Sequence, residues 1–295
     1  MHVTRYQWPV GQGCFATGTI KLDVSGPKTK TLQYVYDCGA RNQTNLRQAI
    51  QAYVSEVDNV DALFVSHLDS DHVSGLDDLL SRVIVKTVYI PYFNNAVSLL
   101  EILKADSDEA LSTSLIEVHL DPASWFGRRG VQRVVRVSNS GDAVPSLRDT
   151  ALLPDTGESE LDSATRLEEL PKAKIDKDSK ASVGSAAELF DLAPGAIIHI
   201  ASGRKFADWV LIPYVNPSPK ENWTAFMKAL RRVLDAKSGE PLTAELLGNA
   251  LRAKHDRHLI KECYNRITKY GSTRQHNRLS MSLYSGPTGM NPSIH

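Results

Sequence analysis

The sequence predicts an α/β fold in which two packed mixed sheets carry helices on their outer sides. Three observations support this prediction. The first 90 residues alternate as two strands, a helix, a strand, a polar loop, a helix and a strand. Apolar runs in the second half supply strands for a second sheet. The polar loop leaves the carboxyl end of a strand, where a rigid sheet can hold functional side chains on irregular backbone.

A β-hairpin opens the predicted fold. Residues 15–24 and 31–36 are rich in residues that favour strands, and Ser25-Gly26-Pro27-Lys28 between them is a turn sequence. The chain should then leave the sheet at Cys38-Gly39. Apolar residues at helical spacing predict a helix from about Thr44 to Glu56, which returns the chain to the sheet.

An acidic and histidine-rich loop follows the strand predicted over residues 62–65. Two histidines and two carboxylates fall within six positions of this loop, namely His67, Asp69, Asp71 and His72. Alternation along an extended chain would place the first three of these side chains on one side. The fourth follows where the chain turns into a helix begun at Ser74.

The residue types of this loop indicate metal binding. Imidazole nitrogens and carboxylate oxygens that converge on one point are ligands for divalent cations. Four such groups are more than one ion normally takes from a single short segment, so the loop predicts two divalent metal ions, zinc or manganese. The alternative is a polar loop whose carboxylates cap the following helix. Capping accounts for one carboxylate and leaves the spacing of the other three groups unexplained.

Beyond the loop, a strand over 86–90 is ended by a proline, and residues 94–114 carry an amphipathic helical pattern in two pieces. Residues 131–137 alternate as a strand. Residues 138–185 are polar and rich in glycine and proline, which predicts a mobile insertion or lid; a connector without function is the alternative.

The second half of the chain returns to regular patterns. Strands are predicted over 195–200 and 209–213, both joining the second sheet. The predicted helices that follow cover 218–236, 243–255 and 257–269. A final strand spans 279–284. We expect residues 1–295 to form a single domain that carries the insertion.

Further motifs accompany the loop in the chain. They are Val10-Gly11-Gln12-Gly13, Tyr36-Asp37-Cys38-Gly39, Val73-Ser74-Gly75-Leu76 and Asn277-Arg278-Leu279-Ser280. With the His-x-Asp-x-Asp-His loop, this set resembles the metallo-β-lactamase-fold hydrolases. Asp69, where most of that family carries a second histidine, is similar to the ComEC-like group of competence proteins. The resemblance covers the first hundred residues well and the last hundred thinly.

The resemblance implies an αββα sandwich with a two-metal hydrolytic site. His67 and Asp69 would ligate the first ion, and Asp71 and His72 the second. A hydroxide held between the ions is the implied nucleophile, and Asp71 would also orient the attacking water. Asp37 would support the metal loop from beneath. A carboxylate in place of an imidazole at Asp69 tilts the preference towards manganese or magnesium, relative to an all-histidine zinc site.

The family pattern also includes later ligands. One more histidine from the second half would complete the first metal site; His119 and His199 lie in strand-like runs, where a histidine is more often structural, and Tyr214 falls where some relatives place a ligand. After the strand over 279–284, the family carries a bridging carboxylate and a last histidine, and neither has a match before His295. We therefore expect that the polypeptide is shorter than its gene or that the site is incomplete.

Glycines and cysteines near the motifs have simpler interpretations. Gly11, Gly13 and Gly39 fit a need for close backbone approach or positive φ, and ordinary turns would explain them equally well. Cys14 stands where the family often has an acid. The three cysteines have no Cys-x-x-Cys spacing, so we expect reduced thiols and no thiolate zinc site.

Charge gives no general case for a nucleic-acid partner, because 34 basic residues balance 34 acidic ones. Between Arg252 and Arg278, however, eight basic residues face two acidic ones. Within this stretch, Lys261, Arg266 and Lys269 could steer a phosphate backbone, and a solvated helix face is the alternative. A smaller cluster contains Arg128, Arg129, Arg133 and Arg136. The histidines expected at the surface are His255, His258 and His276.

No run of the sequence approaches membrane-spanning length, and the first residues lack a basic start followed by an apolar core. A cytoplasmic location is therefore expected. The sequence makes no prediction of the oligomeric state.

Three hypotheses about function follow. The first is a metal-dependent hydrolase, most directly a phosphodiesterase or nuclease acting on DNA or RNA. The second is a hydrolase of small esters, thioesters or lactones with the same site. The third is a non-catalytic binding or regulatory module with a degenerate site. The number of bound metal ions separates the third from the first two, and the basic stretch separates the first two from each other.

Overall fold

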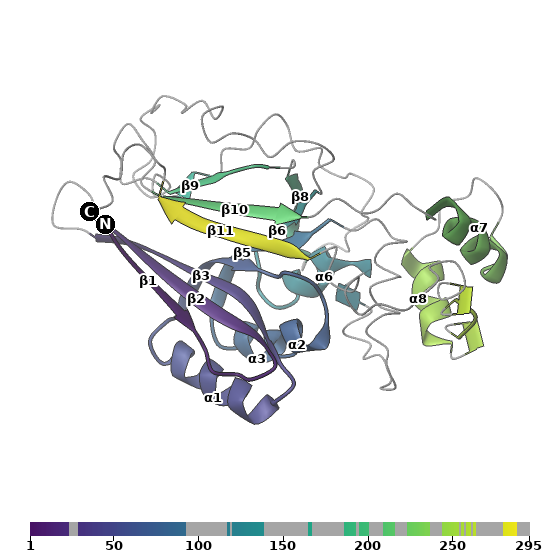
Figure 1. Ribbon diagram of the computed structural model, residues 1–295, viewed down its shortest axis with the longest axis horizontal. Helices are drawn as coiled ribbons and strands as arrows, with labels where there is room; N and C mark the ends of the chain where they lie inside the picture. Colours follow the sequence, from purple (N-terminus) through teal and green to yellow (C-terminus); the bar gives the residue numbers. More distant parts are fainter. Residues whose placement is uncertain are drawn as a thin grey trace.

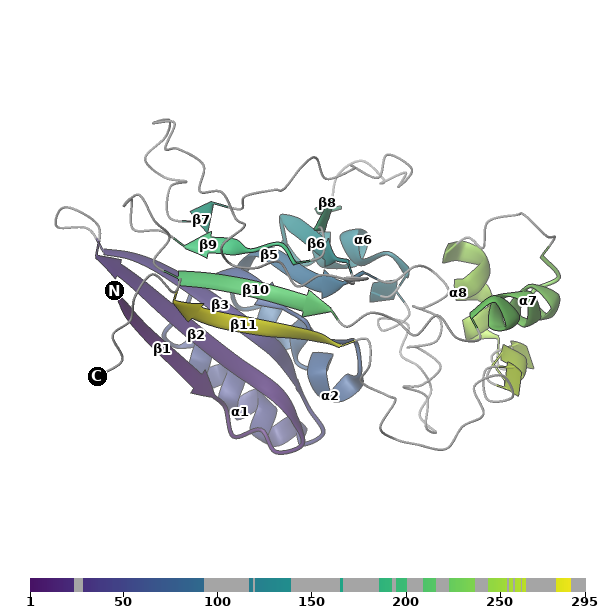
Figure 2. The same cartoon turned by 45° about the horizontal axis from the view of Figure 1, so that its top comes forward.

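A computed structural model describes residues 1–23, 29–92, 117–118, 120–138, 165–166, 186–192, 195–200, 209–215, 223–236, 244–253, 255–256, 258–260, 262–263 and 280–287. Two sheets lie face to face, and helices α1, α2 and α3 lie on the far side of the larger one (Figure 1). The predicted α/β class with two sheets is confirmed. Helices α7 and α8 lie apart from both sheets in the two views (Figure 2).

The larger sheet has seven strands in the order β1-β2-β3-β4-β5-β6-β8. Their bounds are β1 His2–Gln7, β2 Gly13–Asp23, β3 Thr29–Ala40, β4 Asn59–Phe64, β5 Ile84–Pro91, β6 Arg133–Val137 and β8 Glu188–Leu192. The first three are antiparallel, which confirms the predicted hairpin, and each later strand is parallel to its neighbour. β3 continues to Ala40, so the chain leaves the sheet later than Cys38-Gly39.

The smaller sheet has four antiparallel strands in the order β11-β10-β9-β7. Their bounds are β7 Thr165–Arg166, β9 Ile198–Ile200, β10 Trp209–Val215 and β11 Met281–Pro287. The strands predicted over 195–200, 209–213 and 279–284 are therefore present and share the second sheet. β7 comes from the predicted insertion at 138–185, of which residues 139–164 and 167–185 lie outside the described residues.

Helix α1 (Gln43–Val54) confirms the helix predicted between the hairpin and the central strand. The Asn42 side chain accepts a hydrogen bond from the backbone N–H of Asn45 at 3.0 Å and so caps its first turn. Leu46, Ile50 and Tyr53 are buried on one face, at the spacing that a helix needs to pack on a sheet.

The other helices are short or lie late in the chain. They are α2 Ser70–Val73, α3 Leu76–Leu80, α6 Pro122–Gly127, α7 Trp223–Val233 and α8 Ala244–Arg252. The last two confirm helical patterns predicted in the second half. The pattern over 94–114 lies outside the described residues, as does most of the one over 257–269. None of the helices in the described part of the chain is long and apolar enough to cross a membrane.

Two apolar clusters hold the layers together. One lies between the larger sheet and its helices and includes Phe15, Ile50 and Leu79. The other lies between the sheets and includes Phe64, Tyr89 and Leu211. The Phe64 and Tyr89 rings stack with their centroids 4.7 Å apart. Burial of these side chains on both faces makes the larger sheet a rigid base for the loops at its strand ends.

The prediction that the loop stays extended as far as Asp71 is wrong. Asp69 is the last extended residue, with φ −70° and ψ 148°, and α2 begins at Ser70. The backbone N–H groups of His72 and Val73 donate to the carbonyl of Asp69 at 2.9 and 3.1 Å, which closes a helical turn. Asp71 and His72 therefore project from a helix, and the next helix starts at Leu76 instead of Ser74.

The close contact between β3 and α2 depends on Gly39. A Cβ at this position would overlap the backbone of His72 and Val73. We expect Gly39→Ala to lower the free energy of unfolding by about 1–3 kcal/mol or more, as overpacking does. Urea denaturation measures this loss, and amide NMR signals of residues 66–72 should move with it.

Gly130→Ala is the matched control, because Gly130 has φ +84° with open space around the missing Cβ. It should cost only the strain of a left-handed backbone, about 1–2 kcal/mol, and leave the loop signals in place. If Gly39→Ala left the loop signals unmoved, the close contact would not be needed.

Candidate metal centre

The His67–His72 loop begins where the parallel strands of the larger sheet end. β4 ends at Phe64, and the Val65 N–H donates to the carbonyl of Tyr89 in the neighbouring β5 at 2.9 Å. Val65, Ser66 and His67 are all buried. The first residues of the loop are therefore held in place by the neighbouring strand and by burial.

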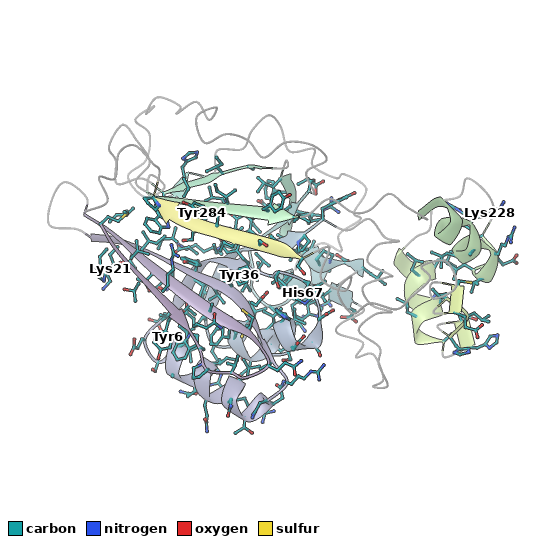
Figure 3. The ribbon with its side chains drawn as sticks, in the orientation of Figure 1. Tyr6, Lys21, Tyr36, His67, Lys228 and Tyr284 are labelled. Carbon is teal, nitrogen blue, oxygen red and sulfur yellow. The ribbon has the colours of Figure 1, made fainter. Side chains whose placement is uncertain are left out.

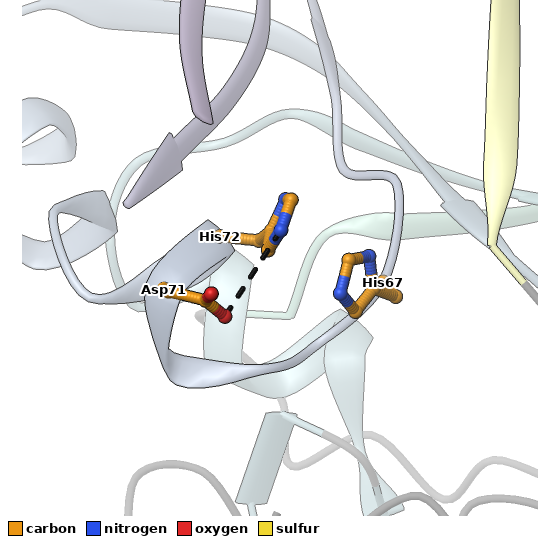
Figure 4. A group of neighbouring side chains, drawn as sticks. All are labelled: His67, Asp71 and His72. Atoms are coloured by element: carbon orange, nitrogen blue, oxygen red, sulfur yellow. Dashed lines mark ion pairs between the residues drawn. The ribbon is translucent and has the colours of Figure 1, made fainter. Parts of the chain in front are cut away.

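The structure brings three of the four predicted ligands into one group. Ligand atoms of His67, Asp71 and His72 all lie within 4.8 Å of one another. Figure 4 shows Asp71 and His72 on the α2 turn and His67 on the loop opposite them. The two imidazole rings have centroids 3.9 Å apart. His72 Nε2 and Asp71 Oδ1 are separated by 4.0 Å.

The fourth predicted ligand, Asp69, lies beside His67. Its Oδ2 atom is 3.4 Å from His67 Nε2. As the residue before α2 it could have been a cap, yet its side chain makes no capping hydrogen bond with that helix. The capping alternative therefore does not explain Asp69. His67 thus lies close to Asp69, and His72 lies close to Asp71. The resemblance implies the same two pairs as ligands of the two ions.

Asp37 lies beneath the loop and is completely buried. One carboxylate oxygen, Oδ1, accepts a hydrogen bond from the Ser66 N–H at 2.6 Å. The other, Oδ2, accepts from the Ser66 hydroxyl at 2.6 Å and from His72 Nδ1 at 2.8 Å. Asp37 has a left-handed backbone with φ 56°, which directs the side chain towards the loop. Asp37 therefore holds Ser66 and His72 through three hydrogen bonds.

The charges around His72 shift its proton affinity. Burial alone would lower the pKa of His72, but the hydrogen bond to Asp37 and the negative charges of Asp37, Asp71 and Asp69 outweigh burial and raise it. Because Nδ1 faces Asp37, the extra proton of the charged form sits on Nε2. A cation bound at Nε2 has to displace that proton.

Two of the three predicted glycines allow close backbone contact at the site. A Cβ on Gly13 would overlap the carbonyl oxygen of Asp71, and one on Gly39 would overlap His72. Gly11 instead has φ +82° with open space around it, so only its backbone conformation favours glycine. The nearby Cys14 thiol has its pKa raised to about 12 by burial and by the charge of Asp37, so it stays protonated.

The second sheet contacts the loop through β11. The Met281 N–H donates to the carbonyl of Ser66 at 2.7 Å, and the Tyr36 hydroxyl donates to the carbonyl of Met281 at 2.7 Å. Figure 3 shows Tyr36 and His67 below this strand. Ser280, from the predicted Asn-x-x-Ser motif, has a buried hydroxyl without a hydrogen-bond partner among the described residues.

The residues considered as a further ligand lie elsewhere. His199 is on β9 between Ile198 and Ile200, which pack between the sheets, so its side chain faces the opposite side of the smaller sheet. Tyr214 alternates with Val215 on β10 in the same way. His119 lies outside the described residues. Among the histidines, cysteines and carboxylates that the structure describes, His199 does not join the group at His67.

The predicted basic surfaces differ in what the structure describes. Lys261, Arg266 and Lys269 lie outside the described residues, and so does His276. His255 and His258 are exposed, as expected. In the smaller cluster, three arginines have acidic partners: Arg128 with Glu117 at 2.8 Å, Arg129 with Asp77 at 2.5 Å and Arg136 with Asp191 at 2.6 Å. These ion pairs reduce the positive charge that the cluster offers to a phosphate backbone.

Ser66 contacts the predicted ligands, although no sequence motif points to it. Its hydroxyl contacts Asp37, His67 and His72, and its backbone joins Asp37 to β11. The only sequence signal is its position, between a buried strand and the first histidine of the loop. Serine is too common at strand ends for that position alone to indicate a role.

The segment that contains the loop is similar to a known protein family. Residues 29–96 match the family model of the metallo-beta-lactamase superfamily. This segment contains β3, α1, β4, the metal loop, α2, α3 and β5, and the mixed α/β architecture of the two sheets agrees with that fold. No curated protein matches the chain in sequence.

Among solved structures, the chain is similar to a long form RNase Z from yeast. The sequence identity is 13% and the TM-score is 0.25. The match covers 30% of this chain and 14% of the yeast protein.

The buried Asp37 carboxylate should be more sensitive to neutralisation than a carboxylate at the surface of the same sheet. We expect Asp37→Asn to lower the free energy of unfolding by about 1–3 kcal/mol, because the amide NH2 would face a donor and leave buried groups unpaired. Chemical denaturation measures the loss.

Asp61→Asn is the control. Asp61 also accepts a backbone N–H, from Gln33 at 2.8 Å, and a lysine side chain, from Lys86 at 2.6 Å, but it is partly exposed. Its loss should be smaller, because water can replace the lost partners. Equal losses would show that Asp37 supports the loop no more than an accessible carboxylate does.

Proposed function

We propose that this chain is a metal-dependent hydrolase that binds two divalent ions at the His67–His72 loop and acts as a phosphodiesterase on DNA or RNA. The observation that carries the proposal is the convergence of His67, Asp71 and His72 within 4.8 Å, with Asp69 beside His67. The match of residues 29–96 to the superfamily model supports the hydrolase class.

The separation of His67 from Asp69 favours a shared cation. Their facing atoms are 3.4 Å apart, which is longer than the usual range of about 2.7–3.2 Å for N–H···O hydrogen bonds. Two donor atoms that each lie about 2.0–2.2 Å from one zinc ion are roughly 3.4 Å apart in tetrahedral geometry. The distance therefore fits coordination of one ion better than a direct hydrogen bond.

Exposure divides the four ligands by role. His67 has only 7% of its side chain exposed, whereas Asp69, Asp71 and His72 have 32%, 23% and 21%. The buried imidazole fixes the first ion from inside. The two carboxylates lie on the solvent side, where a substrate arrives, and Asp71 is the group that would hold and orient the attacking water.

Divalent ions at these ligands would supply an activated water at neutral pH and polarise the scissile phosphoryl group. The chain's own contribution is to hold the four side chains in place through Asp37 and the strand ends. Asp69 adds a hard oxygen ligand, which favours manganese over zinc relative to an all-histidine set. The nucleic-acid substrate is supported by the resemblance to the ComEC-like group and by the basic sequence between Arg252 and Arg278.

Metal titration tests the centre. Equilibrium dialysis of the chain against Mn²⁺ or Zn²⁺, followed by elemental analysis, should find about two ions per chain, as two-metal sites hold. Asp71→Ala and His67→Ala should each reduce this number and abolish hydrolysis. Asp77→Ala, which removes an exposed carboxylate on α3, is the control and should change neither.

Fewer than two ions per chain would favour the non-catalytic module, because that hypothesis assumes a degenerate site. Hydrolysis that survives Asp71→Ala would contradict the assigned role of that carboxylate.

Charge neutralisation tests the substrate class. We expect Lys261→Gln, Arg266→Gln and Lys269→Gln together to reduce cleavage of single-stranded DNA strongly and to flatten its salt dependence, with a log–log slope lower by up to about 0.7 per lost phosphate contact. Hydrolysis of a small neutral ester should not change.

The matched control replaces by glutamine three exposed basic residues from the first fifty residues of the chain, Lys21, Arg41 and Arg47. It alters net charge equally and should leave DNA cleavage intact. Turnover of the ester without any DNA cleavage in the unmodified chain would favour the small-ester hypothesis.

A further inference from the structure

Asp37 contacts His72 directly, and Ser66 connects Asp37 to the other histidine, His67. Asp37 Oδ2 lies 2.8 Å from Nδ1 of His72, so that imidazole is held by the carboxylate itself. The link to His67 runs through the Ser66 hydroxyl, which lies 2.6 Å from Asp37 Oδ2 and 2.9 Å from His67 Nδ1. Ser66 is thus the central member of a buried chain of three polar groups.

The donors and acceptors of this chain have one consistent assignment. A carboxylate can only accept, so the hydroxyl proton of Ser66 lies on the bond to Asp37. The hydroxyl oxygen can then only accept from His67, which requires a proton on Nδ1 of that ring. The same reasoning puts a proton on Nδ1 of His72, because that nitrogen faces the Asp37 oxygen.

Ser66 is held so that its hydroxyl cannot turn away. Its N–H donates to Asp37 Oδ1 at 2.6 Å, and its carbonyl accepts from the Met281 N–H at 2.7 Å. Only 3% of the residue is exposed, so water does not compete for the hydroxyl. Both backbone groups and the side chain are therefore fixed by partners from β3 and β11.

The consequence appears on the other side of the His67 ring. With the proton on Nδ1, Nε2 presents a lone pair 3.4 Å from the carboxylate of Asp69. Without Ser66, the negative charge of Asp69 would draw the proton to Nε2, and a metal ion would have to displace it. The hydroxyl and Asp69 thus compete for the tautomer of His67.

We propose that Ser66 is a positioning residue: its hydroxyl, oriented by the Asp37 carboxylate, sets the position of the proton on His67. One buried acid thereby fixes the metal-binding tautomer of both histidines. This inference deepens the proposed metal site and rests on it for its purpose. The tautomers that it predicts for His67 and His72 exist in the metal-free chain and can be measured there.

The experiment is long-range ¹H–¹⁵N NMR on the metal-free chain labelled with ¹⁵N-histidine, at a pH where both rings are neutral. In the unmodified chain, His67 and His72 should both carry their proton on Nδ1. In Ser66→Ala, His67 should move to the Nε2–H form while His72 keeps its own. Affinity for Mn²⁺ should fall by about 10–100-fold, as for other residues that orient a ligand.

Ser74→Ala is the matched control, because its hydroxyl also lies beside the loop but bonds the backbone of Ala40 at 3.2 Å. It should leave both tautomers unchanged. The proposal is overturned if His67 carries its proton on Nε2 in the unmodified chain, a result that does not depend on whether Ser66→Ala folds. It is also overturned if Ser66→Ala leaves His67 unchanged, or if both histidines change together in Ser74→Ala.

Failure of the metal proposal has a different signature. If the chain binds no divalent ion but the two histidines show the expected tautomers, the proposed role of Ser66 is supported and the proposed metal centre is wrong. If metal binds with the opposite tautomer at His67, the proposed role of Ser66 is wrong and the proposed metal centre is supported.

Discussion

A buried negative charge organises the loop that carries His67, Asp69, Asp71 and His72. Removal of the Asp37 carboxylate from water costs several kcal/mol unless the protein supplies hydrogen-bond donors. The Ser66 N–H, the Ser66 hydroxyl and His72 Nδ1 supply them. Because all three belong to the loop, the loop has to fold over the end of β3 in this one arrangement. The ligand geometry is therefore a consequence of satisfying one buried carboxylate.

The backbone around Asp37 makes that arrangement reachable. Its left-handed φ of 56° turns the side chain towards the loop. Two residues later, Gly39 lets the α2 turn approach so closely that a Cβ would overlap it. The Gly75 N–H then donates to the carbonyl of Cys38 at 2.9 Å and ties the segment after α2 to the same strand. Three consecutive positions of β3, from Asp37 to Gly39, thus set the position and the direction of the loop.

The periodic parts of the fold could be predicted from the sequence, and the parts formed by tertiary contacts could not. The hairpin and α1 follow from strand and helix periods, because their apolar residues pack on one core. β1 lacks such alternation, since five of its six residues are exposed at the edge of the sheet. α2 has only four residues and depends on Gly39 and the Asp69 carbonyl, which no local pattern reveals.

The site shows the same division. The residue types and spacing predict that His67, Asp69, Asp71 and His72 gather, and the structure brings His67, Asp71 and His72 together with Asp69 beside His67. The conformation differs from the predicted one, because a helical turn forms at Ser70–Val73 where the sequence predicts alternation along a strand. Ser66 was missed because its role depends on partners that come from β3 and β11, far from it in the chain.

The contact with β11 couples the loop to the end of the chain. Tyr36 and Met281, which bond each other above the loop, are 245 residues apart. Contacts of such long separation form late in folding, since the loop entropy is lost before the contact is gained. The carbonyl of Ser66 therefore gains its partner only after the second sheet docks. Because binding and folding are linked, a ligand that requires the ordered loop also stabilises that docking. The order of the loop thus depends on contacts with both sheets, although all four proposed ligands come from six consecutive residues of the chain.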